Sequence, residues 1–280
     1  MSQEKKLDRN KILYIALICV FALIFLGSAI YLISYFVESA QESEKYGDLA
    51  SIVESIRQDM GNSSGNTDAS GNPIAPSDPG ATGDTSLILP EYRALYEMNS
   101  DLVGWINIPD TRVNYPVCQN LTTKDYYLYR NFNKEDSKDG CIYVREACDV
   151  FTPSDNVVIY GHRMNSGAMF ADVMNYRKKD FWETHQTFTF DTIYEHHTYQ
   201  VIAVFITSAN YGEGFPYHQF NTASSQAEFD EFIKTVHELQ LYDTGLTAEY
   251  GDMLITLSTC TPRYEQPDNG RFVVIAKRVS

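Results

Sequence analysis

The sequence predicts a mostly β protein: a β-barrel decorated by helices, preceded by one N-terminal transmembrane helix. Three observations carry this prediction. A charge-free apolar run lies near the N-terminus, a segment rich in Gly, Ser and Asn follows it, and eight short runs rich in β-branched residues come after that. The formal net charge of -15 argues against nucleic-acid binding, because a phosphate backbone requires clustered Lys and Arg.

Residues 12–37 are predicted to form the transmembrane helix. Their sequence, ILYIALICVFALIFLGSAIYLISYFV, contains no charged side chain. A helix of this length exceeds the ~30 Å hydrocarbon core of a bilayer, and a secretory signal has only ~7–15 apolar residues. We therefore expect an uncleaved, single-pass anchor in the cell membrane. Because residues 1–11 are rich in Lys and Arg, the positive-inside rule places them in the cytoplasm and the rest of the chain outside.

Two segments separate the anchor from the folded domain. Residues 38–60 carry apolar side chains at helical spacing from Leu49 to Ile56, which predicts a juxtamembrane helix. Residues 61–86 consist largely of Gly, Ser, Asn, Asp and Pro, which predicts a disordered linker. The folded domain is therefore expected over residues 87–280.

Short apolar runs separated by turn residues predict the strands of this domain. The eight predicted strands are residues 103–109, 113–118, 140–144, 156–161, 187–191, 198–209, 253–258 and 271–278. Helices are expected over residues 87–99, 167–185 and 224–240, the last with Ser224 or Ser225 as its N-cap. A decorated β-barrel fits this order better than alternating βαβ units.

The five cysteines do not form a recognisable disulfide framework. Cys19 lies within the anchor, and the other four are too few and too irregularly spaced. Cys141 and Cys148 either bridge a short loop or remain free buried thiols, and both possibilities stay open. Since the sequence has no CxxC or HExxH motif and no metal-ligand spacing of histidines, we expect no metal site and no cofactor.

Cys260 is the strongest candidate for chemistry. It stands where a predicted strand ends, because Pro262 cannot continue a central strand. By alternation it shares one face with Thr256 and Ser258, which is polar for a core face. To act as a nucleophile, such a thiol needs a cationic neighbour that favours the thiolate.

Two further residues are expected near Cys260. His162 ends the run NVVIYGH, so the chain has two strand ends that each deliver one reactive group. Arg271 opens the strand after the Cys260 loop, and hairpin pairing would bring it back beside the thiol. A guanidinium there can stabilise an oxyanion. Arg263 is the rival arginine, closer in sequence but within the loop.

The stretches VVIYGHRMNSGAMF, TLSTC and GRFVVIAKR resemble the sortases, and specifically class B, over residues 90–278. The resemblance implies an eight-stranded sortase-type barrel and a membrane-anchored cysteine transpeptidase of Gram-positive bacteria. Cys260 would attack the Thr carbonyl of a C-terminal sorting signal on a secreted surface protein, an Asn-Pro-X-Thr-like or related pentapeptide. A peptidoglycan amine would then resolve the thioacyl intermediate. His162 would serve as general acid and base, and Arg271 would stabilise the tetrahedral intermediate.

Several alternatives stay open beside this interpretation. Ser258 either hydrogen-bonds the substrate or packs within its strand, and we expect the helical insert and the loops around residues 119–127 to line the signal pocket. The acceptor is either a peptidoglycan amine or, in a pilin polymerase, a pilin lysine. A membrane-tethered binding module with an incidental thiol is the non-enzymatic alternative. A papain-like hydrolase is disfavoured, because its Cys precedes its His whereas His162 precedes Cys260.

Overall fold

The computed structural model describes residues 9–63, 87–152, 154–210, 212–262 and 269–280. Most of the predicted cytoplasmic tail, most of the predicted linker and Arg263 lie outside the described residues. The chain divides into two units, residues 1–43 and residues 44–280, which are described separately below.

The first unit is helical. It contains the greater part of α1 (Arg9–Ser63), and the apolar side chains between Ile12 and Val37 are exposed around this helix. By length and composition α1 can cross a membrane. The predicted anchor therefore lies on a continuous helix.

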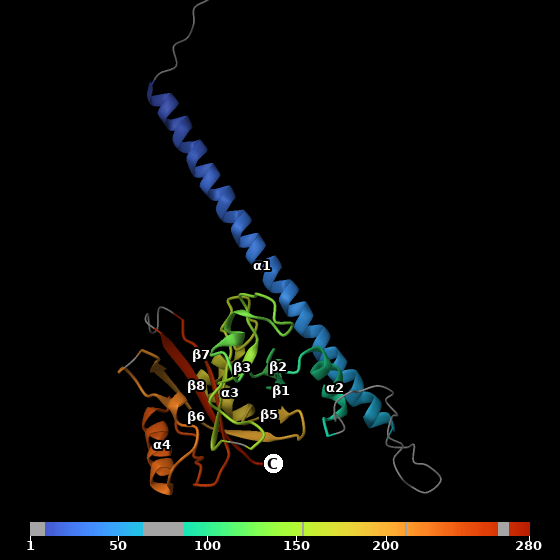
Figure 1. Ribbon diagram of the computed structural model, residues 1–280. Coiled ribbons are helices and arrows are strands. Elements are labelled where there is room, and N and C mark those ends of the chain that lie inside the picture. The colour runs from blue at the N-terminus through green and yellow to red at the C-terminus, as the bar shows by residue number, and fades with distance from the viewer. Residues whose placement is uncertain (1–8, 64–86, 153, 211, 263–268) are drawn as a thin grey trace, which may run out of the picture. The chain divides into compact units, whose positions relative to one another are not determined.

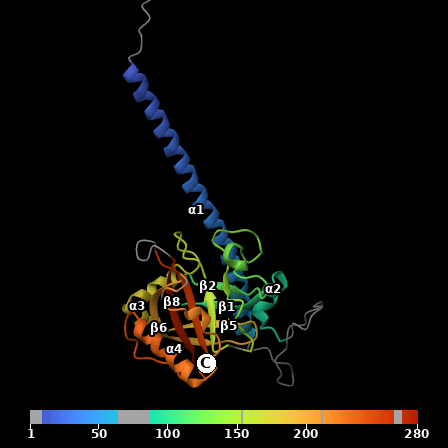
Figure 2. The same ribbon diagram turned by 60° about the vertical axis from the view of Figure 1, so that its left-hand side comes forward.

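The second unit is built on a closed barrel of eight strands (Figures 1 and 2). The strands are β1 (Leu102–Asn107), β2 (Asn114–Cys118), β3 (Ile142–Val144), β4 (Asn156–Tyr160), β5 (Thr187–Thr192), β6 (Thr198–Ser208), β7 (Leu254–Cys260) and β8 (Gly270–Arg278). Their order around the barrel is β1-β2-β3-β4-β7-β8-β6-β5, and β5 pairs back to β1. The β2–β3 and β4–β7 pairs are parallel, and the other pairs are antiparallel. The predicted fold is confirmed, and closure pairs both edges of every described strand.

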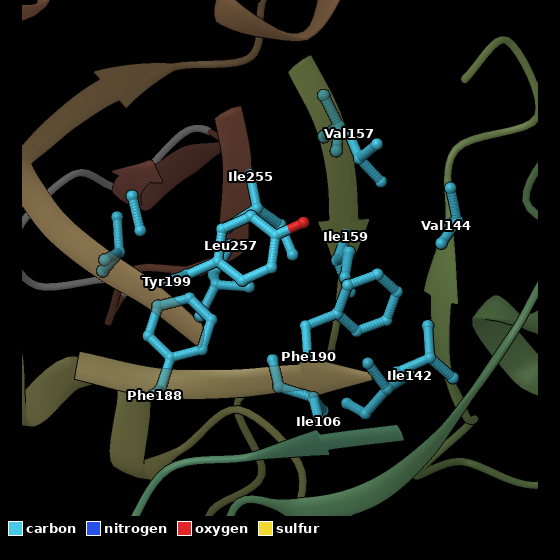
Figure 3. Packing of buried hydrophobic residues seen from close by; sticks show 14 of the residues in the cluster. Ile106, Ile142, Val144, Val157, Ile159, Phe188, Phe190, Tyr199, Ile255 and Leu257 are labelled. Atoms are coloured by element: carbon cyan, nitrogen blue, oxygen red, sulfur yellow. The ribbon is translucent and has the colours of Figure 1, made fainter. Parts of the chain in front are cut away.

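Branched and aromatic side chains fill the barrel interior (Figure 3). Ile106, Ile159, Phe190, Ile255 and Leu257 are each at most 1% exposed. Because successive side chains of a strand point to opposite faces, Ile255 and Leu257 inside the barrel leave residues 254, 256, 258 and 260 on the outer face of β7. Cys260 therefore stands on the outer face of the strand, at its end.

Helices decorate the barrel. They are α2 (Pro90–Met98), α3 (Lys179–Thr184) and α4 (Gln226–Leu239), with 3-10 helices η1 (Tyr126–Tyr129), η2 (Asp172–Arg177) and η3 (Tyr217–Gln219). Ser225 is the N-cap of α4, since its hydroxyl accepts a hydrogen bond from the backbone N–H of Glu228 at 3.3 Å. The predicted helix over residues 167–185 is wrong in its first part. Gly167 and Met169 have φ values of +87° and +56°, which a right-handed helix cannot contain.

The last turns of α1 pack against the barrel domain within the second unit. Tyr46, Leu49 and Val53 are at most 6% exposed. The Tyr46 hydroxyl donates a hydrogen bond to the Gly140 carbonyl oxygen at 2.8 Å and accepts one from the backbone N–H of Phe132 at 3.2 Å. The predicted apolar stripe of the juxtamembrane helix is thus part of the core, and the compact unit begins before the predicted domain start at residue 87.

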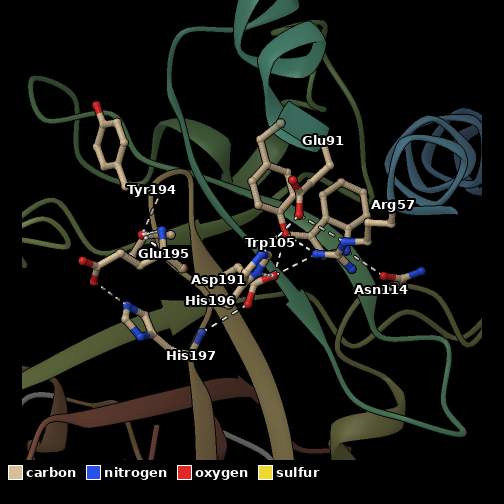
Figure 4. Close-up of polar contacts among 11 residues, drawn as sticks. Arg57, Glu91, Trp105, Asn114, Asp191, Tyr194, Glu195, His196 and His197 are labelled. Carbon is tan, nitrogen blue, oxygen red and sulfur yellow. Dashed lines mark hydrogen bonds and ion pairs between the residues drawn. The ribbon is translucent and has the colours of Figure 1, made fainter. Parts of the chain in front are cut away.

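One guanidinium from α1 compensates two buried carboxylates of the barrel domain (Figure 4). Arg57 lies 2.8 Å from Asp191 Oδ2 and 3.3 Å from Glu91 Oε1, and the side chains of Asp191 and Glu91 are only 6% and 1% exposed. The Tyr92 hydroxyl donates to the same Asp191 oxygen at 2.6 Å, and His196 Nδ1 lies 2.9 Å from it. Burying a carboxylate is costly unless a partner compensates its charge, so this cluster ties α1 to the barrel.

Replacing Arg57 is expected to destabilise the second unit. Arg57→Met keeps most of the side-chain length but leaves Asp191 and Glu91 without their cation, which should lower the free energy of unfolding by about 1–3 kcal/mol. Urea unfolding of the full chain in detergent, followed by tryptophan fluorescence, measures this loss. The control is Lys234→Met, which removes an exposed pair with Glu231 and should cost less than about 1 kcal/mol. Equal losses in the two variants would contradict the proposed role of Arg57.

Candidate active site

Two parallel strands bring His162 and Cys260 to the same rim of the barrel. In the β4–β7 pair, Tyr160 stands opposite Ser258. The backbone N–H of Gly161 donates to the Ser258 carbonyl oxygen at 3.2 Å, which extends the pairing beyond the end of β4. Because the two strands run in the same direction, the residues that follow Tyr160 and Ser258 emerge side by side.

Arg271 reaches the same rim from the neighbouring strand. In the antiparallel β7–β8 pair, Cys260 and Arg271 are direct partners. Within the part of the chain that the structure describes, the Arg271 guanidinium has no carboxylate partner, and it donates only to the adjacent Gly270 carbonyl oxygen at 3.2 Å. The β7–β8 pairing thus places a cation beside the thiol.

The three side chains line one cleft of about 410 Å³. The other described residues that line it include Lys124, Asp125, Leu128, Tyr143, Arg145, Glu146, Tyr160, Tyr217, His218, Ser258 and Thr259. Cys260 is a free thiol and is exposed in this cleft. A thiol, an imidazole and a guanidinium that meet in one cleft are groups that can form a thioester and stabilise the oxyanion of the tetrahedral intermediate that leads to it.

A backbone carbonyl holds the imidazole of His162 in one orientation. His162 Nε2 lies 2.7 Å from the Leu128 carbonyl oxygen. A carbonyl oxygen only accepts hydrogen bonds, so Nε2 carries the proton and Nδ1 of the neutral ring keeps its lone pair. The backbone N–H of Phe170 also donates to the His162 carbonyl oxygen at 2.8 Å. The ring is therefore fixed by the segment that contains η1.

The glycine before His162 is required by close packing. A Cβ atom at Gly161 would lie 2.5 Å from Ile142 Cδ1 and 2.6 Å from Phe170 Cγ. Both neighbours are completely buried, so neither has space to move away. The YGH motif therefore lets the end of β4 approach its neighbours closely enough to deliver His162 to the cleft.

The polar face of β7 divides into a structural part and a part at the cleft. Thr256 donates to Asn156 Oδ1 at 2.7 Å and so links β7 to β4. Ser258 lines the cleft, and its hydroxyl lies 2.6 Å from that of Tyr217. Burial raises the pKa of Tyr217, so its phenol stays protonated at neutral pH. The Ser258 hydroxyl is thus already hydrogen-bonded at the wall of the cleft.

One wall of the cleft depends on an arginine that the sequence did not single out. Arg145 Nη1 donates to the His218 carbonyl oxygen and lies 3.1 Å from Asn221 Oδ1. It thereby holds the segment containing η3 against β3. Burial, together with the charges of Arg145, Lys124 and Arg271, lowers the pKa of His218. Nothing local in the sequence marks Arg145, because its partners are 73 and 76 residues away.

Some of the segments expected at the signal pocket line this cleft. The loops around residues 119–127 do contribute to the cleft, through Lys124 and Asp125. No residue of α4 is among those that line this cleft in the described part of the chain, so the expectation that the helical insert lines the signal pocket stays a prediction. The segment just before α4, which includes η3, forms one wall of the cleft.

The remaining cysteines of the second unit are buried and free. Cys141 Sγ lies 3.9 Å from Cys118 Sγ, so its thiol neighbour is Cys118 and not Cys148. Cys148 Sγ accepts a hydrogen bond from the backbone N–H of Val158 at 3.4 Å. Burial raises the pKa of both Cys118 and Cys148, which disfavours their thiolates. Cys260 is therefore the accessible thiol of this unit.

Comparison with known proteins agrees with this geometry. A family model described as a sortase domain matches residues 106–279. Sortase B of Listeria monocytogenes is 31% identical over 190 residues, which span 68% of this chain and 74% of that protein. The chain is a class B sortase. It is accordingly a cysteine transpeptidase.

Solved structures of sortases share the same fold. The crystal structure of sortase B from Bacillus anthracis in complex with AAEK1 has a TM-score of 0.67 and 28% identity, covering 88% of this chain and 99% of that chain. A Staphylococcus aureus sortase B–substrate complex has a TM-score of 0.70 at 24% identity, covering 87% of this chain and 99% of that chain. At this identity, the similarity shows only that the fold is the same. The barrel is therefore the sortase B barrel.

The hydrogen bond to Leu128 predicts the tautomer of His162 in this sortase. In ¹⁵N NMR spectra of the full chain with labelled histidine, the neutral His162 ring should carry its proton on Nε2 and leave Nδ1 unprotonated, because the carbonyl oxygen can only accept. His162→Asn identifies the resonance by its disappearance. A neutral ring protonated on Nδ1 would show that the Leu128 contact does not hold the imidazole.

Proposed function

We propose that this sortase cleaves the C-terminal sorting signal of secreted surface proteins at Thr and joins the new acyl group to an amine of cell-wall peptidoglycan. The observation that carries the proposal is the meeting of Cys260, His162 and Arg271 in one cleft, on adjacent strand ends. The expected signal is an Asn-Pro-X-Thr-like or related pentapeptide. The catalytic domain acts outside the cell, and residues 12–37 anchor it to the membrane with the N-terminus in the cytoplasm.

In the first half of the reaction, the Cys260 thiolate attacks the carbonyl carbon of the signal Thr. The C–S bond forms, and the carbonyl oxygen becomes an oxyanion that Arg271 stabilises. When the oxyanion collapses, the peptide C–N bond breaks and the leaving amine takes a proton from the His162 imidazolium. Because Nε2 is held by Leu128, we expect Nδ1 to carry the transferred proton. The product is a thioester on Cys260.

In the second half of the reaction, an amine attacks the thioester carbonyl carbon. The new C–N bond forms, the neutral His162 takes the proton from the attacking nitrogen, and the C–S bond breaks to release the Cys260 thiolate. Arg271 stabilises the second oxyanion as it does the first. Ser258, at the wall of the cleft, is positioned to exchange its hydrogen bond with Tyr217 for one with the bound signal.

The N-terminal helix supports the proposed location. A helix long and apolar enough to cross a membrane precedes the catalytic unit, and basic residues lie before it. With the N-terminus in the cytoplasm, the catalytic unit meets secreted proteins as they emerge and the peptidoglycan precursors on the same side. No step of the proposed reaction requires a metal ion or a cofactor.

The full chain in detergent, incubated with Asn-Pro-X-Thr-type peptides, should form a thioacyl adduct on Cys260 that intact-mass and peptide mass spectrometry detect. Triglycine and lysine-bearing peptides serve as amine acceptors and should yield ligated product. Arg271→Ala should lower kcat/KM for peptide cleavage by about 10²–10³-fold, the usual cost of losing one oxyanion donor. Cys260→Ala should form no adduct.

Arg278→Ala is the matched control, because Arg278 lies at the opposite end of β8 from Arg271. It should retain most of the activity, as should Arg263→Ala. The absence of an adduct with every peptide, or an adduct on a different cysteine, would overturn the proposal. Loss of activity in Arg263→Ala but not in Arg271→Ala would assign the oxyanion role to the other arginine.

A further inference from the structure

A second cleft lies next to the active-site cleft. It has a volume of about 640 Å³ and is lined by Tyr96 of α2 and by four further segments of the second unit. These are residues 100–103 at the start of β1, residues 119–122 after β2, residues 146–152 after β3, and residues 193–194 between β5 and β6. The reaction proposed above assigns no role to this cleft.

Exposed apolar side chains form one side of the second cleft. Leu121 is 71% exposed, Phe151 is 49% exposed and Tyr194 is 41% exposed. The rings of Phe151 and Tyr194 meet edge to face, with their centroids 5.1 Å apart. Figure 4 shows the Tyr194 ring pointing away from the Arg57 cluster. An exposed apolar group of this kind, contributed by separate loops, is typical of a binding surface.

The charged side chains that line this cleft are all negative. Asp101, Glu146 and Asp149 line it, and no Lys, Arg or His is among its described lining residues. Asp101 is compensated by Lys134 at 3.1 Å. The carboxylate of Glu146 has no hydrogen bond or ion pair with any other described residue, so its charge remains available to a cationic ligand.

The charge of the active-site cleft is different. Lys124, Arg145 and Arg271 line that cleft together with Asp125 and Glu146. Two adjoining clefts with different charge suit two different substrates, one bound near the cations and one near the carboxylates.

The two clefts adjoin each other at Glu146. Glu146 lines both of them, and the segment from Gln119 to Asp125 contributes its first residues to one cleft and its last residues to the other. The Gln119 side-chain amide donates to the carbonyl oxygens of Arg145 and Cys148, at 3.0 Å and 2.7 Å. These hydrogen bonds connect the segment after β2 to the segment after β3. Glu146 therefore stands at the boundary between the second cleft and the cleft that contains Cys260.

We propose that the second cleft binds the acceptor substrate, a peptide that carries a second cationic group besides its reacting amine. The inference rests on the proposed function, because an acceptor exists only if a thioester forms on Cys260. While the thioester is present, the signal peptide occupies the active-site cleft, so the acceptor has to enter from another side. The cationic group lies near Glu146 and Asp149, the peptide packs on Phe151 and Tyr194, and the neutral amine reaches the thioester carbonyl carbon. There the C–N bond forms, the C–S bond breaks, and the amine proton passes to His162.

Two acceptor peptides test this assignment, Gly-Gly-Gly-Lys-amide and Gly-Gly-Gly-norleucine-amide, which share the reacting amine and differ in one positive charge. Calorimetry on the full-length Cys260→Ala chain in detergent measures their binding without any chemistry. The lysine peptide should bind about fivefold more tightly, as expected for one partly solvated charge contact. In the active chain, KM for the two acceptors should differ by the same factor.

Two variants locate the site. Asp149→Asn keeps the hydrogen bonds that Asp149 Oδ1 accepts from the backbone N–H groups of Phe151 and Thr152, and removes only the charge. It should bring the two peptides to nearly equal affinity. Phe151→Ala should weaken both peptides about fivefold to tenfold, because an aromatic contact is lost. Neither variant should change hydrolysis of the signal peptide when no acceptor is present.

The chain offers a matched control for each variant. Asp243 Oδ1 accepts a hydrogen bond from the backbone N–H of Gly245 in a similar exposed turn, so Asp243→Asn removes an equivalent charge elsewhere. Tyr250 is 50% exposed, like Phe151, and Tyr250→Ala removes an aromatic ring outside both clefts. Both controls should leave the affinities for the two acceptor peptides unchanged.

Three results have distinct meanings. Equal or undetectable binding of the two peptides, or binding that Asp149→Asn and Phe151→Ala do not alter, would overturn the acceptor site. Tighter binding of an uncharged N-acetylglucosamine disaccharide that depends on Phe151 would overturn it as well and assign the cleft to glycan. Charge-dependent peptide binding without any thioacyl adduct in the active chain would support the cleft as a cationic-peptide site and contradict the proposed function instead.

Discussion

The parallel pairing of β4 with β7 is the constraint on which the catalytic arrangement depends. Since both strands run toward the same rim, the residues after Tyr160 and Ser258 emerge side by side, and the antiparallel β8 begins at that rim with Arg271. A shift of one residue in this pairing would turn the outer face of β7 inward and bury the thiol. Closure of the barrel opposes such a shift, because every strand is paired on both sides. The active site is thus a consequence of strand register.

The charged side chains of the second unit fall into two groups, those with an ion-pair partner and those without one among the described residues. Where a charge only supports the fold, it is compensated: Arg57 from α1 neutralises Asp191 and Glu91, two carboxylates that are almost completely buried. At the clefts, charges are left available. Among the residues that the structure describes, Arg271 has no carboxylate partner and Glu146 has no hydrogen-bond or ion-pair partner. Because an uncompensated charge near a low-dielectric surface interacts strongly with a ligand, these two residues are where substrates are expected to gain most from electrostatics.

Much of the fold and of the candidate site was predictable from local sequence patterns. The strands are runs of β-branched residues with clear ends. Gly161 and Pro262 mark where β4 and β7 end, next to His162 and Cys260. Other features depend on distant parts of the chain. Arg145 acquires its role from a segment more than 70 residues away, and the thiol neighbour of Cys141 is set by the β2–β3 pairing. The sequence predicted a helix from residue 167, but Met169 has a positive φ, so no helix forms there.

A structure of a trapped intermediate tests the central claim most directly. The full chain would be treated with a signal-peptide analogue in which a thiol-reactive group replaces the Thr carboxyl carbon, and its crystal structure determined. The account predicts a covalent bond to Cys260 Sγ, with the oxygen that mimics the oxyanion about 3 Å from the Arg271 guanidinium. An adduct on Cys260 whose oxygen points away from Arg271 and accepts hydrogen bonds only from other groups would contradict it.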